Sequence, residues 1–185
     1  MKEDYNTIEQ TVRHTFASVV WSHKIQEKQA DIYSIQFNKM ETAKIISASL
    51  TSVGVVSLIF TDEIWMKIIA ALISFVTVFI SAFFKSFDLQ TMVTAHKSTA
   101  NKLLSIRHDI QLLLLKTRLR KCDESSLIDE YEIIIKNLND VYSTAPNTTD
   151  KAVEKARAAL NITHDNSFSD DEIDSNLPKS LQMGG

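Results

Sequence analysis

The chain has 185 residues, of which 44% are hydrophobic, with 3 glycines, 2 prolines and a formal net charge of -3. So few glycines and prolines favour long helices over sheets and could hardly supply a glycine-rich phosphate loop. The slightly acidic charge is not that of a nucleic-acid-binding protein, so we expect no direct contact with nucleic acid. The single cysteine, Cys122, cannot form an internal disulfide, which is typical of a reducing compartment.

Residues 5–41 are predicted to form a first long helix. The apolar residues Ile8, Val12, Phe16 and Val19 recur at steps of three and four, as on one face of a helix. Neither proline nor glycine interrupts this stretch. We therefore expect the helix to run directly into the apolar segment that follows.

Two apolar runs, at about 45–60 and 68–84, come next and are separated by a short polar connector. Each lies in an uncharged stretch of about 17 residues, which as a helix is roughly 25 Å long against a hydrocarbon core of about 30 Å. The runs predict a two-helix transmembrane hairpin. The alternative is a buried hairpin in a soluble helical bundle, although soluble helices normally carry a charged stripe that both runs lack.

The charges around the two runs predict how the hairpin is oriented. Lys39 and Lys44 precede the first run, and Lys85 and further lysines follow the second. The connector TDEIWMK carries two acidic residues and one lysine. Because lysines near a membrane favour its cytoplasmic side, we predict that both termini are cytoplasmic and the connector lies outside.

Small and hydroxyl-bearing residues line one face of each run. These residues are Ser47, Thr51 and Gly54 in the first run, and Ser74, Thr77 and Ser81, together with Ala70, in the second. Such residues let membrane helices approach closely and hydrogen-bond across the contact. The face could pack within the hairpin, or it could line the water-filled centre of an oligomer. Since two spans cannot enclose a pore, conduction would require a homo-oligomer.

Residues 85–120 are predicted to form one long helix, continuous with the second run. Its steps of four and three place His96, Leu103, Ile106 and Ile110 on a coiled-coil-like seam. The short connector holds the two runs side by side, so we expect this cytoplasmic seam to pair with residues 5–41 in an antiparallel arrangement. The run Leu112–Leu115 makes the helix apolar nearly all round, which indicates more than one packing partner.

The remaining chain predicts two shorter helices and a tail. A helix at about 126–142, capped by Ser125 or Ser126, is ended by Pro146, and a short helix follows at 149–160. Residues 161–185 are polar and acidic, and we expect them to be disordered. The expected fold is thus all-α: an integral membrane hairpin extended into a cytoplasmic helical bundle over residues 1–160.

Catalytic chemistry has little support in this sequence. The histidines, at positions 14, 23, 96, 108 and 164, form no metal-ligand spacing with one another or with Cys122. The basic cluster Lys116, Arg118, Arg120 and Lys121 is interpreted as a solvated helix end that complements the helix dipole. We therefore expect no enzyme activity, no bound cofactor and no metal.

The order of these features resembles a known family, the SLATT domain, over about residues 8–160. The resemblance depends on a helical hairpin followed by AHKSTANKLLSIRHDIQLLL, with His96 and Ala100, and by YEIIIKNLNDVYSTAPN, with Tyr131, Leu138 and the pair Ala145-Pro146. SLATT domains are two-transmembrane effector domains associated with nucleotide-second-messenger and related conflict systems of bacteria. The acidic tail lies outside the resemblance.

The resemblance implies a membrane effector of bacterial antiphage defence, located in the inner membrane. Such an effector would respond to a co-encoded partner, of which a nucleotidyltransferase and a reverse transcriptase are the two candidates. It would then oligomerise, permeabilise the lipid bilayer and stop growth of the infected cell in an abortive infection. The alternative function is a structural, membrane-anchored helical scaffold for a cytoplasmic partner.

Overall fold

The computed structural model describes residues 2–60, 63–86, 88–165, 168–179 and 182, with side chains for all of these except 2–4, 53, 55, 57–60 and 84–86. Within these ranges the regular structure is entirely helical, so the chain is an all-α protein as predicted. The helices are α1 (Lys2–Phe60), α2 (Ile64–Ser86), α3 (Leu89–Leu119), α4 (Glu124–Thr144), α5 (Asp150–Asn161) and α6 (Asp170–Ser175).

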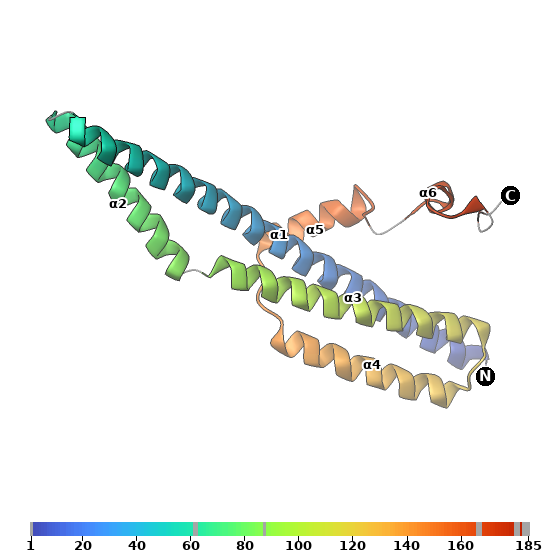
Figure 1. Cartoon of the computed structure of the whole chain (residues 1–185). Helices are drawn as coiled ribbons and strands as arrows, with labels where there is room; N and C mark the ends of the chain where they lie inside the picture. The colour runs from blue at the N-terminus through green and yellow to red at the C-terminus, as the bar shows by residue number, and fades with distance from the viewer. Residues whose placement is uncertain (1, 61–62, 87, 166–167, 180–181, 183–185) are drawn as a thin grey trace.

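Helix α1 is the longest element and belongs to two parts of the molecule. Its 59 residues correspond to a length of about 90 Å. The N-terminal half packs among α3, α4 and α5, whereas the C-terminal half extends away from them beside α2 (Figure 1). The predicted helix at 5–41 and the first apolar run are therefore parts of one uninterrupted helix.

The chain reverses after α1, and α2 returns along it. The two helices are closest near their connection, and α2 diverges from α1 with distance from that point (Figure 1). The prediction that α2 and α3 form one continuous helix is wrong, because α2 ends at Ser86 and α3 begins at Leu89. Asp88 caps α3, and its carboxylate accepts a hydrogen bond from the Thr91 backbone amide at 3.0 Å. Such capping favours a new helix start at this position.

A three-helix bundle of α1, α3 and α4 holds the main hydrophobic core. Helix α3 runs antiparallel to α1, since Arg118 near its end contacts Glu9 and His96 near its start contacts Gln26. Helix α4 lies along the same bundle (Figure 1). The core consists of Val12, Val19, Leu103, Ile106, Ile110, Leu113, Leu127, Ile134, Leu138 and Val141.

Polar contacts fix the position of α4 against its neighbours. The Thr15 and Tyr131 hydroxyls are 2.7 Å apart, and the Ser22 and Tyr142 hydroxyls are 2.9 Å apart. These two pairs show that α4 runs parallel to α1. The cap of α4 is Asp123, and neither Ser125 nor Ser126 as predicted, because the Asp123 carboxylate accepts the Ser126 amide at 3.2 Å.

The C-terminal helices are short and differ in how they pack. Helix α5 buries Ala152, Ala156 and Ala159 and contacts α1. Alanines allow close approach of the two helices. Helix α6 begins at a capping box formed by Ser169 and Glu172 and has no buried residue. It lies within the segment that the sequence predicts to be a disordered tail.

Candidate functional site

The apolar surface of α2 is left uncovered by the rest of the described chain. Residues Ile64–Phe83 are long and apolar enough to cross a membrane, and only 6% of this stretch is buried. Its 20 residues correspond to about 30 Å of helix, which matches the hydrocarbon core of a bilayer. In a soluble bundle such a helix would be covered by protein, and here it is not.

The first predicted span, 45–60, is only partly covered by the structural description. The side chains of residues 53, 55 and 57–60 lie outside the described part of the chain. Among the described residues of this stretch, Ile45, Ile46, Leu50 and Val56 are exposed large apolar side chains. Among the described residues, α2 is the one helix that is both long enough and apolar enough to cross a membrane. The second membrane-crossing helix therefore stays a prediction.

The faces of small residues on α1 and α2 are the less exposed sides of the two helices. Ser47, Thr51 and Gly54 are half-buried in α1, and Ala70 is buried in α2. A Cβ atom placed on Gly54 would lie 3.6 Å from the Cβ atom of Ala70, which is ordinary van der Waals contact. Packing between the C-terminal end of α1 and the start of α2 therefore covers this face near the connection of the two helices.

Along α2 the same face becomes more exposed. Ser74 and Thr77 are half-buried, whereas Ser81 is exposed, in agreement with the divergence of α2 from α1 (Figure 1). The hydroxyls of Thr77 and Ser81 donate to the backbone carbonyls of Ile73 and Thr77, each at 2.9 Å. Thr51 does the same to Ser47 in α1. Each oxygen can still accept a hydrogen bond from another helix.

The seam of α3 lies against α1. His96, Leu103, Ile106 and Ile110 are all buried. The three apolar residues belong to one cluster with Val12 and Val19 of α1. This placement follows from helical periodicity, since steps of three and four keep residues on one side of α3.

A buried polar layer, formed by His23, Gln26, Gln29 and His96, interrupts the apolar contact. The Gln26 side-chain oxygen lies 2.6 Å from His96 Nδ1, and its amide nitrogen donates to the Pro146 carbonyl at 3.2 Å. Gln29 accepts hydrogen bonds from the Thr149 amide and hydroxyl, both at 2.8 Å. The layer thus joins α1 to α3 and to the chain between α4 and α5.

Burial lowers the pKa of both histidines in this layer. Desolvation lowers the pKa of His96 below its ordinary value, and it is also the largest effect lowering the pKa of His23. Because the oxygen of Gln26 can only accept, neutral His96 carries its proton on Nδ1. Within the described part of the chain, His96 Nε2 and His23 Nδ1 have no hydrogen-bond partner.

The arrangement is therefore an apolar helical arm, uncovered by the chain itself, attached to a helical bundle through one continuous helix. A family model described as "SMODS and SLOG-associating 2TM effector domain family 4" matches residues 8–172. The chain belongs to this SLATT family. The chain has no match among curated proteins or among solved structures.

Membership in the SLATT family connects the exposed arm to a membrane. The family's description is of a two-transmembrane effector domain, and α2 has the length and composition of one such span. The match extends to residue 172 and so includes α5 and the first residues of α6. The resemblance noted from the sequence is confirmed, with a boundary beyond residue 160.

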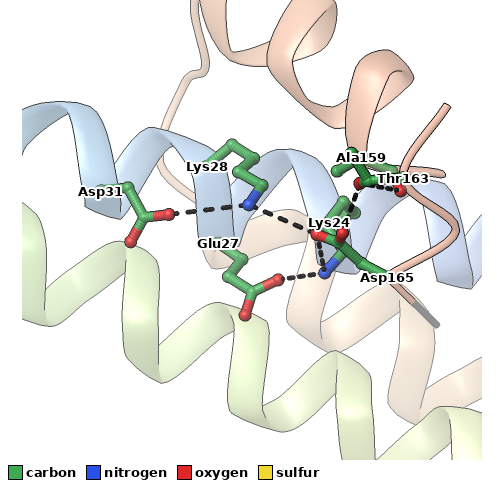
Figure 2. A network of polar contacts seen from close by, with 7 residues as sticks. All are labelled: Lys24, Glu27, Lys28, Asp31, Ala159, Thr163 and Asp165. Atoms are coloured by element: carbon green, nitrogen blue, oxygen red, sulfur yellow. Dashed lines mark hydrogen bonds and ion pairs between the residues drawn. The ribbon is translucent and has the colours of Figure 1, made fainter.

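Sequence reasoning missed one group of residues in this SLATT chain, which we name the Asp165 clamp. The carboxylate of Asp165, just after α5, lies 3.6 Å from both Lys24 Nζ and Lys28 Nζ on α1 (Figure 2). Lys24 also pairs with Glu27 at 2.7 Å, and Thr163 donates a hydrogen bond to Asp165. Lysines at an i, i+4 spacing were the available signal, but their partner is distant in sequence.

The basic cluster at the end of α3 is more structured than predicted. Lys116 pairs with Glu130 of α4 at 2.8 Å, and Arg118 pairs with Glu9 of α1 at 2.9 Å. The guanidinium of Arg120 lies over the ring of Tyr5 at 5.4 Å from its centre. Three of the four residues therefore contact other parts of the bundle, while the Arg118 side chain remains largely exposed.

Proposed function

We propose that this protein is the membrane effector of a bacterial conflict system that acts against phage. The C-terminal end of α1 and helix α2 cross the inner membrane as a hairpin, and the bundle of α1, α3, α4 and α5 lies in the cytoplasm. The observation that carries the proposal is the uncovered apolar helix Ile64–Phe83 in a chain of the SLATT family. The lysines that flank the hairpin support an orientation with both termini inside.

Self-assembly of several copies is the second part of the proposal. The hairpin leaves Ser81 exposed, and lipid cannot offer a hydrogen-bond partner to its hydroxyl oxygen. A neighbouring copy can cover this end of the face. Each hydroxyl contact between membrane helices is worth only about 0.6 kcal/mol, so assembly is weak by itself and depends on a trigger. The assembled hairpins permeabilise the membrane and arrest growth.

The trigger in this proposal comes from a cytoplasmic partner acting on the bundle. A co-encoded nucleotidyltransferase or reverse transcriptase is the partner to test first, and the protein itself performs no catalysis and needs no cofactor. Because α1 passes from the bundle into the hairpin without a break, a change in the packing of its N-terminal half can reach the membrane arm directly.

Regulated expression with recording of membrane potential tests the proposed function. The protein is expressed with its genomic neighbours, the system is triggered, and depolarisation is expected. The variant Ser74→Leu/Thr77→Leu/Ser81→Leu should still insert, since lipid tolerates leucine, but should form fewer oligomers and leak less. Its matched control is Ile69→Leu/Val76→Leu/Val78→Leu, at exposed apolar positions of the same helix, which should behave as the parent.

A membrane-anchored scaffold is the second candidate function. It is favoured by the exposed Leu112 and Leu115 on α3, because exposed neighbouring leucines indicate a surface that another protein segment covers. If the triggered parent never depolarises cells, this function replaces the first. If the triple leucine variant depolarises cells as fully as the parent, the hydroxyl face takes no part in permeabilisation.

A further inference from the structure

The leucine run of α3 is only partly used by the bundle. Leu113 is completely buried in the core and Leu114 is half-buried. Leu112 and Leu115, in contrast, are 50% and 53% exposed. The sequence indicates more than one partner for this run, and the structure shows that α1 and α4 leave one side of it open.

An open groove of about 800 Å³ lies between α1 and α3 on this side. Its apolar surface is formed by Phe16, Leu112, Leu114 and Leu115, and its basic rim by Arg13, His108 and Arg118. The leucines lie about 35 Å along α3 from Leu89, where α3 starts beside the membrane arm. The groove is therefore too far from the bilayer surface for lipid headgroups to cover it.

The rim of the groove is basic. Glu9 forms ion pairs with both arginines: its Oε1 lies 2.9 Å from Arg118 Nε and 4.0 Å from Arg13 Nη1. One carboxylate thus faces two guanidinium groups, and both arginine side chains are largely exposed. A positive charge remains at the rim, so an acidic occupant is favoured.

This charge argues against packing of two identical grooves face to face. Such a contact would place the arginines of one copy next to those of the other, and like charges across an interface are unfavourable. The apolar surface consequently needs an occupant that carries apolar side chains among acidic ones.

The C-terminal segment 168–177 of this same chain has that composition. It carries Asp170, Asp171, Glu172 and Asp174 and has neither lysine nor arginine. Phe168 and Ile173 are 69% and 45% exposed, so the chain's own bundle does not bury them. The capping box at the start of α6 gives the segment a formed helical turn.

We propose that the groove of one copy binds the acidic segment 168–177 of a second copy. Phe168 and Ile173 cover the exposed leucines, and the carboxylates of Asp170 and Asp171 lie opposite Arg13 and Arg118. Both surfaces are uncovered within a single chain, which is the state expected of partners that meet between chains. The contact deepens the self-assembly in the proposed function by placing a cytoplasmic interface beside the membrane one.

Disulfide cross-linking of full-length protein in detergent tests the proposal. The native thiol is first removed by Cys122→Ser. One tagged copy then carries Leu115→Cys and a differently tagged copy carries Ile173→Cys. We expect a disulfide between the two differently tagged copies. It should form several-fold faster than when Leu115→Cys is replaced by the control Ile133→Cys, at an exposed apolar position on α4. Cross-linking no faster than this control would overturn the proposal.

Two further outcomes would also overturn it. One is a disulfide that forms only when both cysteines are in the same chain, which would show folding of the segment onto its own groove. The other is a dominant cross-link between Leu115→Cys residues of two copies, which would show that the two grooves pack against each other.

Charge reversal gives an independent measurement. Arg118→Glu in the copy with the groove should lower the cross-linking rate several-fold, and Asp171→Lys in the other copy should restore it. Lys136→Glu, on the exposed surface of α4, should have no effect. Cross-linking reports contact and not leakage. Loss of cross-linking with leakage intact would therefore count against this contact alone. Loss of leakage with cross-linking intact would count against the proposed permeabilisation alone.

Discussion

Lys24 and Asp165 join the C-terminal end of α5 to the middle of α1. The side chain of Lys24 is only 6% exposed, and its ammonium nitrogen lies 3.6 Å from Asp165 Oδ2 and 2.7 Å from Glu27 Oε2 (Figure 2). A buried lysine needs such partners, because an unpaired charge away from water is costly. The contact holds the start of the C-terminal segment against the helix that continues into the membrane arm.

Replacement of Asp165 by asparagine should release the segment that follows α5 while leaving the bundle folded. Lys24 keeps Glu27 as a partner, so the loss is local. Limited proteolysis should cut the variant faster near residues 162–168 than the parent, whereas Asp140→Asn on the surface of α4 should change nothing. The hydrogen bond from Thr163 lowers the pKa of Asp165, so the clamp stays charged at neutral pH and weakens only as the pH falls below about 4.

The bundle should lose stability on mild acidification. An unfolded histidine has a pKa of about 6.5, whereas burial lowers the pKa of His23 and His96 in the folded protein. The unfolded state therefore binds more protons below about pH 6.5, and the stability present above that pH is lost as the pH falls toward the folded pKa values.

Thermal unfolding in detergent at about pH 7.5 and about pH 5.5 measures this dependence. Around His23, Glu27 opposes the lowered pKa, while Arg107, Lys24 and His108 reinforce it. His23→Gln should reduce the difference in melting temperature between the two pH values. His14→Gln, at an exposed position, should leave it unchanged; an equal effect of both variants would contradict the assignment to burial.

Leu103→Asp should destabilise the contact between α1 and α3 strongly. Leu103 is almost completely buried in the core, so an aspartate there would be an unpaired buried charge. We expect a loss of about 3–4 kcal/mol in the free energy of unfolding. The control Ile133→Asp, at an exposed position on α4, should cost well under half of that. Unchanged thermal stability of Leu103→Asp would show that the seam is misassigned.

The contact between the two arms near their connection should tolerate a methyl group at Gly54 but not a larger side chain. A Cβ atom on Gly54 meets Ala70 at normal van der Waals distance, and alanine is the better helix former by about 1 kcal/mol. Gly54→Ala should therefore be neutral or stabilising, whereas Gly54→Leu should separate the arms. Melting temperatures in detergent would order the variants; equal values for both would argue against this contact.

Both ends of the chain should be on the cytoplasmic side of the membrane. A cysteine placed at Glu63 in the Cys122→Ser background should react with an impermeant reagent added from outside. A reporter fused after Gly185 should be active only as a cytoplasmic protein, because the lysines at the hairpin flanks hold them inside. Extraction of the protein by alkaline carbonate would contradict an integral location.

The buried faces of the bundle helices could be predicted from the sequence because they depend on local periodicity. Val12 and Val19 on α1, and Leu103 and Ile110 on α3, are each separated by two helical turns, so each pair lies on one face of its helix and is buried together. The break between α2 and α3 was missed because neither proline nor glycine separates the two helices in the sequence. Asp88, followed three residues later by Thr91, was the local signal of a new helix start.

An all-α chain, two uncharged apolar runs and a buried seam on α3 follow from the sequence alone, because hydrophobicity and helical spacing are local properties. Which polar groups meet depends instead on how the helices pack: Gln26 contacts His96, Gln29 contacts Thr149, and Lys24 contacts Asp165. These pairs join segments far apart in the chain, and their partners depend on the register at which whole helices pack. No periodicity within one segment contains that register, because it results from the combined fit of side chains on every helix in contact.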